Sequence, residues 1–156
     1  MRQITIYTLL LLVISAISEV YASAPPLLDW QKCIGGSGLD MPVKVIRSQD
    51  GSLLMIGSTG SSDGNISLNH GSSDVWLCKT DSAGQLLWEK TFGGSNNDIG
   101  TGIIQLSNGD LILSGYTASY DGDVSNQHGN FDCWIIKTNA SGSIIWEKTF
   151  GGSLVD

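Results

Sequence analysis

The sequence Trp-Glu-Lys-Thr-Phe-Gly-Gly-Ser at residues 88–95 occurs again, unchanged, at residues 146–153. A related stretch, Trp-Gln-Lys-Cys-Ile-Gly-Gly-Ser, occupies residues 30–37, so the tryptophans are spaced by 88 − 30 = 58 and 146 − 88 = 58 residues. Residues 30–87 align with residues 88–145 without a gap and are identical at 22 of 58 positions. A fixed period of this length is typical of stacked supersecondary units, so the repeat decides the fold class.

Residues 1–24 have the layout of a secretory signal peptide. Arg2 supplies a positive start, residues 4–17 are mostly apolar, and Ala22-Ser23-Ala24 is a small-residue cleavage sequence. The apolar run is shorter than the ~20 residues that a membrane-spanning helix needs. We therefore expect a mature chain, residues 25–156, that is secreted or held at the cell surface and has no stable membrane span.

The composition excludes one class of partner and argues against a disulfide framework. The formal net charge is −7, with 15 acidic and 8 basic residues, and nucleic acid binding requires clustered Lys and Arg. The three cysteines, Cys33, Cys78 and Cys133, fall at different positions of the repeat. A framework built into the unit would recur with it, so we interpret them as small apolar strand residues; a single disulfide remains open.

Each unit contains four short apolar segments separated by turn residues. None has the length of a helix, and β-branched and aromatic residues dominate, which predicts strands. Asp50-Gly51 and Asn108-Gly109 are typical hairpin turns. We therefore predict an all-β chain of four-stranded antiparallel meanders. Its parts are an isolated last strand at 27–34, complete units at 43–92 and 101–150, and the start of a further unit at 151–156.

The central strands of each unit are apolar at consecutive positions, as in residues 53–56 and 134–136. Such strands need cover on both faces. A radial array of blades, the β-propeller, provides that cover with roughly 4–8 units, so two units predict an incomplete ring. We expect further blades in the same polypeptide, with this sequence a fragment of a larger protein; self-assembly into a ring is the less favoured alternative.

A set of motifs recurs in both units: Trp-x-Lys-(x)2-Gly-Gly-Ser-(x)2-Asp, Asp/Asn-Gly-(x)5-Gly-x-Thr, and His-Gly-(x)2-Asp-x-Trp-(x)2-Lys-Thr. This pattern resembles the extracellular seven-bladed β-propeller-type repeat of large bacterial secreted proteins, and the resemblance covers essentially the whole mature chain. It implies a multi-blade module of an exported or cell-surface protein. It carries no catalytic residues. Residues 79–88 are also similar to the tryptophan-docking repeat of quinoprotein dehydrogenases, which implies a structural role.

Candidate ligand positions lie in the long links between the second and third strands. Carboxylate and amide oxygens there are hard ligands suited to calcium, or alternatively turn and cap residues that bond backbone amides. The turn interpretation is the favoured one, and calcium is the only cofactor considered. The positions concerned, which also form the predicted loop rim for ligands, are Asp63, Asn65, Asp74, Asp121, Asp123 and Asp132.

Other repeated residues have structural interpretations. One histidine per unit, His70 and His128, lacks the spacing of a zinc site, so a hydrogen-bonded loop histidine is favoured. The aspartates that follow each Gly-Gly-Ser are expected to bond turn amides between units, and the tryptophans are expected to pack between blades. These positions are Asp40, Asp98, Asp156, Trp30, Trp76, Trp88, Trp134 and Trp146.

The function favoured by the sequence is a secreted or surface module that binds a protein or carbohydrate through a loop-rich face. No nucleophile elbow, phosphate-binding glycine loop or paired glutamate is visible, so we predict no catalysis by this chain. Two alternatives stay open. The chain is part of a propeller enzyme, a quinoprotein or polysaccharide hydrolase, with catalytic residues outside it, or it is a structural spacer.

Overall fold

The computed structural model describes residues 27–154, which contain eight strands and no helix. The strands form two four-stranded antiparallel sheets in the orders β1-β2-β3-β4 and β5-β6-β7-β8, which confirms the predicted all-β meanders. The predicted signal peptide and Asp156 lie outside the described residues. The strands are β1 Asp40–Arg47, β2 Leu53–Thr59, β3 Asp74–Thr80, β4 Leu86–Phe92, β5 Asp98–Gln105, β6 Leu111–Thr117, β7 Asp132–Thr138 and β8 Ile144–Phe150.

The first strand of each sheet is longer than its apolar segment. β1 begins at Asp40 and β5 at Asp98, three residues before Val43 and Thr101. A register shift between Pro42 and Lys44, and its equivalent in β5, marks a β-bulge inside each strand. Because a bulge interrupts the alternation of side chains between faces, the apolar pattern shows only the part of the strand that follows it.

Residues 27–34 form no strand, which corrects the expectation of an isolated last strand there. A strand requires backbone hydrogen bonds to a neighbour. Each third strand in the described part of the chain is already paired on both edges, β3 with β2 and β4 and β7 with β6 and β8. The segment instead lies extended beside the first sheet, with the ring of Trp30 over Gly84.

Four short turns close the hairpins with one shared geometry. In the first turn the Gly51 amide donates to the Ser48 carbonyl, and the Ser48 amide donates to the Ser52 carbonyl. The glycine of each turn has a positive φ, between 77° at Gly84 and 90° at Gly109. A side chain disfavours that backbone conformation, so the Asp-Gly and Asn-Gly dipeptides of the sequence mark these turns for a physical reason.

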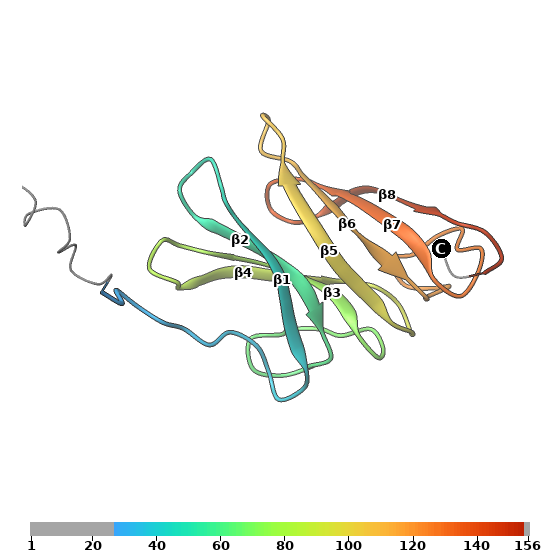
Figure 1. Ribbon diagram of the computed structural model, residues 1–156, viewed down its shortest axis with the longest axis horizontal. Coiled ribbons are helices and arrows are strands. Elements are labelled where there is room, and N and C mark those ends of the chain that lie inside the picture. Colours follow the sequence, from blue (N-terminus) through green and yellow to red (C-terminus); the bar gives the residue numbers. More distant parts are fainter. Residues whose placement is uncertain (1–26, 155–156) are drawn as a thin grey trace, which may run out of the picture.

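The two sheets stand side by side, with β5 against the first sheet (Figure 1). The interface between them holds most of the core: Leu54, Ile56, Val75 and Leu77 of the first sheet face Ile103, Leu111, Leu113, Trp134 and Ile136 of the second. A second cluster of Ile66, Trp76 and Cys78 lies on the other face of the first sheet, beneath the 60–73 link.

Equivalent residues of the two units differ sharply in exposure because a second sheet covers only one face of each sheet. Val45 of β1 is 59% exposed, whereas Ile103, its equivalent in β5, is 2% exposed beneath the first sheet. Phe92 is 3% exposed and its equivalent Phe150 is 56% exposed. The apolar residues on both faces of each unit thus become buried wherever another unit packs against them.

The cysteines do not share one environment. Cys78 is buried in β3, and burial together with the charge of Glu89 raises the pKa of its thiol to about 12. Cys33 and Cys133 are exposed. Cys133 lies in β7, whereas Cys33 lies outside any strand, so the interpretation of all three as strand residues is wrong for Cys33. None of the three forms a disulfide. Over residues 27–154, no helix is long and apolar enough to cross a membrane.

Candidate functional site

Four links converge at one end of the two sheets. These are the connections 60–73 and 118–131 between the second and third strands, the link 93–97 between the sheets, and its equivalent 35–39 before β1. In an antiparallel meander, the end of each even strand and the start of the next odd strand lie at the same edge. We call this edge the loop rim, and it contains every candidate ligand position predicted from the sequence.

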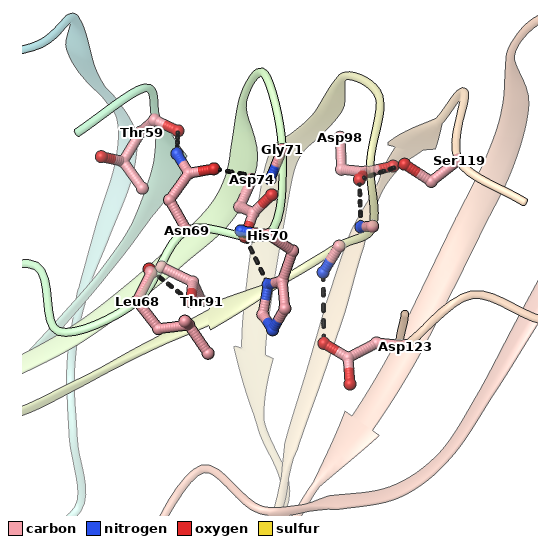
Figure 2. Close-up of polar contacts among 12 residues, drawn as sticks. Thr59, Leu68, Asn69, His70, Gly71, Asp74, Thr91, Asp98, Ser119 and Asp123 are labelled. Atoms are coloured by element: carbon pink, nitrogen blue, oxygen red, sulfur yellow. Dashed lines mark hydrogen bonds and ion pairs between the residues drawn. The ribbon is translucent and has the colours of Figure 1, made fainter. Parts of the chain in front are cut away.

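Asp98 is the centre of a hydrogen-bond cluster in the loop rim. Its Oδ2 accepts from the Gly94 amide at 2.8 Å and from the Ser119 hydroxyl at 2.7 Å (Figure 2). Its Oδ1 accepts from the Thr117 hydroxyl. Asp40 repeats the arrangement. The Gly36 amide donates to it at 2.7 Å, and hydroxyl groups of the first unit supply the remaining bonds. Both aspartates therefore bond turn amides of the link that precedes their own strand.

The tips of the long links are held against the same inter-unit links. Asp63 Oδ1 accepts from the Ser37 amide at 2.7 Å, and Asp121 Oδ1 accepts from the Ser95 amide at 2.7 Å. The hydrogen bond from the Ser37 amide holds the pKa of the Asp63 carboxyl below its usual value. At the position two residues later, Asn65 and Asp123 accept from the amides of Gly35 and Gly93, each at 3.2 Å. The side chains of the predicted ligand set are thus acceptors for backbone amides.

Asp74 and Asp132 anchor the other end of each long link. Asp74 Oδ2 accepts from the His70 amide at 2.9 Å and lies 2.6 Å from His70 Nδ1. In the second unit, the His128 amide donates to Asp132 Oδ2 at 2.6 Å, while the ring Nδ1 is 3.5 Å away. Both histidines are loop residues bonded to a carboxylate, which is the environment favoured by the sequence.

A group of carboxylates surrounds Gly93 at the junction of the two sheets. A Cβ atom at Gly93 would lie 2.5 Å from Asp98 Oδ2 and 2.8 Å from Asp74 Oδ1. Asp74 and Asp98 are fully buried, and Asp74 Oδ1 has no hydrogen-bond partner. Burial raises the pKa of each carboxyl, and nearby charges add to the effect, Asp123 for Asp74 and Asp74 for Asp98.

These contacts bear on the two chemical interpretations of the link carboxylates. Asp63, Asn65, Asp121 and Asp123 all bond to backbone amides, as the turn interpretation expects. Over residues 27–154, no three side chains of the His, Cys, Asp and Glu types are grouped so as to hold a metal ion. We therefore assign these oxygens to backbone anchoring, and calcium binding stays an untested prediction of the sequence.

The second unit has a pocket in the loop rim that sequence reasoning missed. Its volume is about 450 Å³, and its lining consists of Asn96, Asn97, Ala118, Tyr120, Asn130 and Phe131. The Tyr120 ring is 65% exposed while its hydroxyl donates to the Gly129 carbonyl at 2.6 Å. Phe131 meets Tyr116 edge to face, with ring centroids 5.6 Å apart. Aromatic rings and the side-chain amides of three asparagines line the site, and the Asn96 amide donates to the Ala118 carbonyl at 3.1 Å.

A comparison of the two repeat units locates the aromatic residues of this pocket in the sequence. Tyr120 aligns with Ser62, and Phe131 aligns with Ser73, so both aromatic residues belong to the second unit alone. The repeated residues of the link, such as Asp121, are those that anchor the backbone. Departures from the repeat at exposed positions were therefore the signal that would have found the pocket.

The five repeated tryptophans occupy three environments. Trp134 is 1% exposed in the core between the sheets, and Trp88 packs against that core. Trp76 is 1% exposed in the second cluster, where its Nε1 has no partner, whereas Trp134 Nε1 donates to Glu147 Oε2 at 2.7 Å. Trp30 and Trp146 are 42% and 40% exposed, one on each outer side of the pair of sheets.

Comparisons with known proteins show one partial likeness. No family model matches the chain. Over 121 residues the chain is 28% identical to a protein described as Regulatory protein FlaEY from Caulobacter vibrioides. The alignment covers 70% of this chain and 13% of that protein, so the likeness concerns a small part of a much longer polypeptide.

Proposed function

We propose that this chain is a secreted or cell-surface repeat module of the β-propeller type that binds a ligand through its loop rim. Further blades complete the ring around the two sheets; the sequence favours blades of the same polypeptide, and copies of this chain are the alternative. The support for the ring lies in the apolar outer faces, where Val45 and Phe150 are 59% and 56% exposed although their equivalents are buried. The signal-peptide layout of residues 1–24 supports secretion.

One observation carries the binding role: the second unit departs from the repeat where its side chains reach solvent in the loop rim. Hydrogen bonds that Asp98, Asp121 and Asp123 accept from backbone amides hold the backbone of that unit in the same way as in the first unit. On this shared scaffold, Tyr120 and Phe131 replace two serines and line a pocket of about 450 Å³. Variable side chains on a rigid frame are typical of binding surfaces.

The pocket chemistry indicates the class of ligand. Aromatic rings offer apolar faces, and the amide groups of Asn96, Asn97 and Asn130 offer both donors and acceptors. Ligands that present apolar faces beside hydroxyl or amide groups match this lining. Saccharides and extended peptides both have that character, in agreement with the carbohydrate or protein partner expected from the sequence.

The test is binding of the full chain to glycan and peptide arrays, followed by titration of each hit. Tyr120→Ser and Phe131→Ser give the second unit the residues that the first unit carries at Ser62 and Ser73, so we expect both variants to fold. Each should weaken binding by about tenfold or more, the usual effect of removing an aromatic anchor. Ser62→Ala, the equivalent position of the first unit, is the matched control and should bind normally.

Two results would redirect the proposal. Unchanged affinity in both aromatic variants would place the ligand elsewhere, and the absence of any hit would favour the spacer alternative. Turnover of a bound polysaccharide, detected as new reducing ends, would favour the hydrolase alternative instead of a binding module.

A further inference from the structure

The pair of sheets has two apolar faces that no second sheet covers, and these faces differ from each other. On the first sheet, Pro42, Val45, Leu53 and Met55 form what we call the leading face. On the second sheet, the trailing face consists of Ile104, Tyr116, Cys133 and Phe150. All four side chains are exposed, Ile104 by 54%, Tyr116 by 39% and Phe150 by 56%. Exposed apolar side chains gathered on one face favour contact with another protein surface.

The contact between the first and second sheets shows which kind of surface packs against each of these faces. There, the trailing side of the first sheet, with Val75 and Phe92, packs against the leading side of the second sheet, with Ile103 and Leu111. By the repeat of 88 − 30 = 58 residues, Cys133 and Phe150 are equivalent to Val75 and Phe92. In the same way Val45 and Leu53 are equivalent to Ile103 and Leu111. The two uncovered faces are therefore the two halves of an interface that the chain already forms once.

Tryptophan–glycine contacts give this relation a specific geometry. The Trp88 ring lies over Gly142, where an added Cβ would be 3.3 Å from Cζ3, and the Trp30 ring lies over Gly84, where an added Cβ would be 2.6 Å from Cζ3. The sequence contains three tryptophans of this series and two such glycines. Trp146, the third tryptophan, is 40% exposed on the trailing side of the second sheet.

We propose that the trailing face of one copy of this chain docks on the leading face of a second copy, with Trp146 placed over the second copy's Gly84. This occupant follows from continuity with the internal interface, which supplies the contacts, the register and the ring position. The contact is heterologous, because different faces meet, so successive copies close into a ring or extend as a filament.

Residues 27–34 compete for the same position. On the first sheet this segment takes the place that β4 takes on the second sheet, since Trp30 covers Gly84 as Trp88 covers Gly142. It fills the leading face incompletely: a pocket of about 500 Å³ remains between Trp30 and Ile34 on one side and Val45, Leu53 and Met55 on the other. A second copy that places β8 there must displace the segment. Residues 27–34 therefore act as a removable cover that limits association.

Single substitutions in the full chain distinguish the role of residues 27–34, which cover the leading face, from the role of β8, which docks on it. Trp30→Ala should strengthen association, and Trp146→Ala should weaken it, each by about tenfold or more in sedimentation velocity across a concentration series. Both side chains are about 40% exposed, so we expect the fold to persist, and circular dichroism checks that it does. Ile145→Ala is the matched control, because Ile145 and its equivalent Leu87 are exposed in both units.

A cross-link tests the register directly. Inside the chain, an added Cβ at Gly100 would lie 3.0 Å from Val75 Cγ1, and the equivalents of these residues are Pro42 and Cys133. In a Cys33→Ser background, Pro42→Cys should form a disulfide with the native Cys133 of another copy under mild oxidation. Cys133→Val, which restores the residue of the first unit, should abolish the cross-link.

The proposal is overturned if the parent chain and Trp30→Ala both remain monomeric at all concentrations, a result that would leave further blades of the same polypeptide as the occupant. It is also overturned if both tryptophan variants shift association in the same direction. Cross-linking that persists in Cys133→Val would show a different contact between copies.

Discussion

Asp98 and Asp74 are two buried carboxylates at the junction of the sheets that differ in the hydrogen bonds they accept. Asp98 accepts three hydrogen bonds, from Gly94, Thr117 and Ser119. Asp74 bonds through Oδ2 alone, and its Oδ1 is buried without a partner beside Gly93. A buried charged oxygen without a donor costs free energy unless the group takes up a proton. The junction therefore holds its carboxylates with raised pKa values.

A dependence of stability on pH follows from these raised values. The folded chain binds protons at Asp74 and Asp98 more tightly than the unfolded chain, whose aspartates titrate near 3.8. The free energy of unfolding should therefore decrease as the pH rises from about 4 through the raised pKa values. In Asp74→Asn the side chain stays uncharged, so this decrease should become smaller. Urea unfolding at a series of pH values measures it.

Asp110→Asn is the control with the opposite sign. Bonds from Asn108 and Lys137 lower the pKa of Asp110, so its stabilising contribution is present above 3.8 and is lost as the pH falls through the lowered value. This variant should lose stability above pH 4 while keeping the decrease caused by the junction. An Asp74→Asn profile parallel to that of the parent chain would contradict the assignment.

The strands and turns of this chain were predictable because local chemistry and the repeat agree. Positive φ at Gly51 and Gly109 explains why Asp-Gly and Asn-Gly mark the hairpins. Consecutive apolar residues mark β2 and β7 as strands, although burial alternates along β7 because a second sheet covers only one of its faces. The prediction for residues 27–34 was wrong because a β-strand needs a neighbouring segment to accept and donate its backbone hydrogen bonds. The Trp30 motif is present, but its hydrogen-bonding neighbour is not among the described residues.

Gly142 tests how the turns contribute to contact between the sheets. Gly142→Ala imposes a side chain at φ 81° and places a Cβ 2.9 Å from Lys90 Cγ and 3.3 Å from the Trp88 ring. Gly109→Ala imposes comparable strain at φ 90°, but its Cβ would lie 3.5 Å from Ala140 Cβ, an ordinary contact. Both should destabilise by about 1 kcal/mol or more, and Gly142→Ala by the larger amount.

Chemical denaturation of the two variants beside the parent chain gives the comparison. Because the backbone strain is common to both glycines, the difference between their free energies of unfolding reports the contact with Trp88. Equal losses of stability would mean that the ring moves aside without cost.

The arrangement of the whole molecule explains which parts of the candidate site were predictable. Asp40, Asp63, Asp98 and Asp121 recur with the repeat, and their shared role as acceptors for link amides recurs with them. Tyr120 and Phe131 of the pocket align with serines of the first unit, so reasoning based on repeated residues passed over it. Function on a repeated scaffold resides where the copies differ, whereas stability resides where they agree.

The rate of amide hydrogen exchange should depend on whether a second sheet covers a strand, and not on the position of that strand in the repeat. β1 and β5 are equivalent strands with the same bulge, but β5 contacts the first sheet while the face of β1 around Val45 is uncovered. Local opening is easier where few apolar contacts are lost, so amides of β1 should exchange faster than their equivalents in β5. If copies dock as proposed, raising the protein concentration should slow exchange in β1 and β8 and leave β5 unchanged. Equal protection of β1 and β5 in dilute solution would show that cover by a second sheet does not govern the stability of these units.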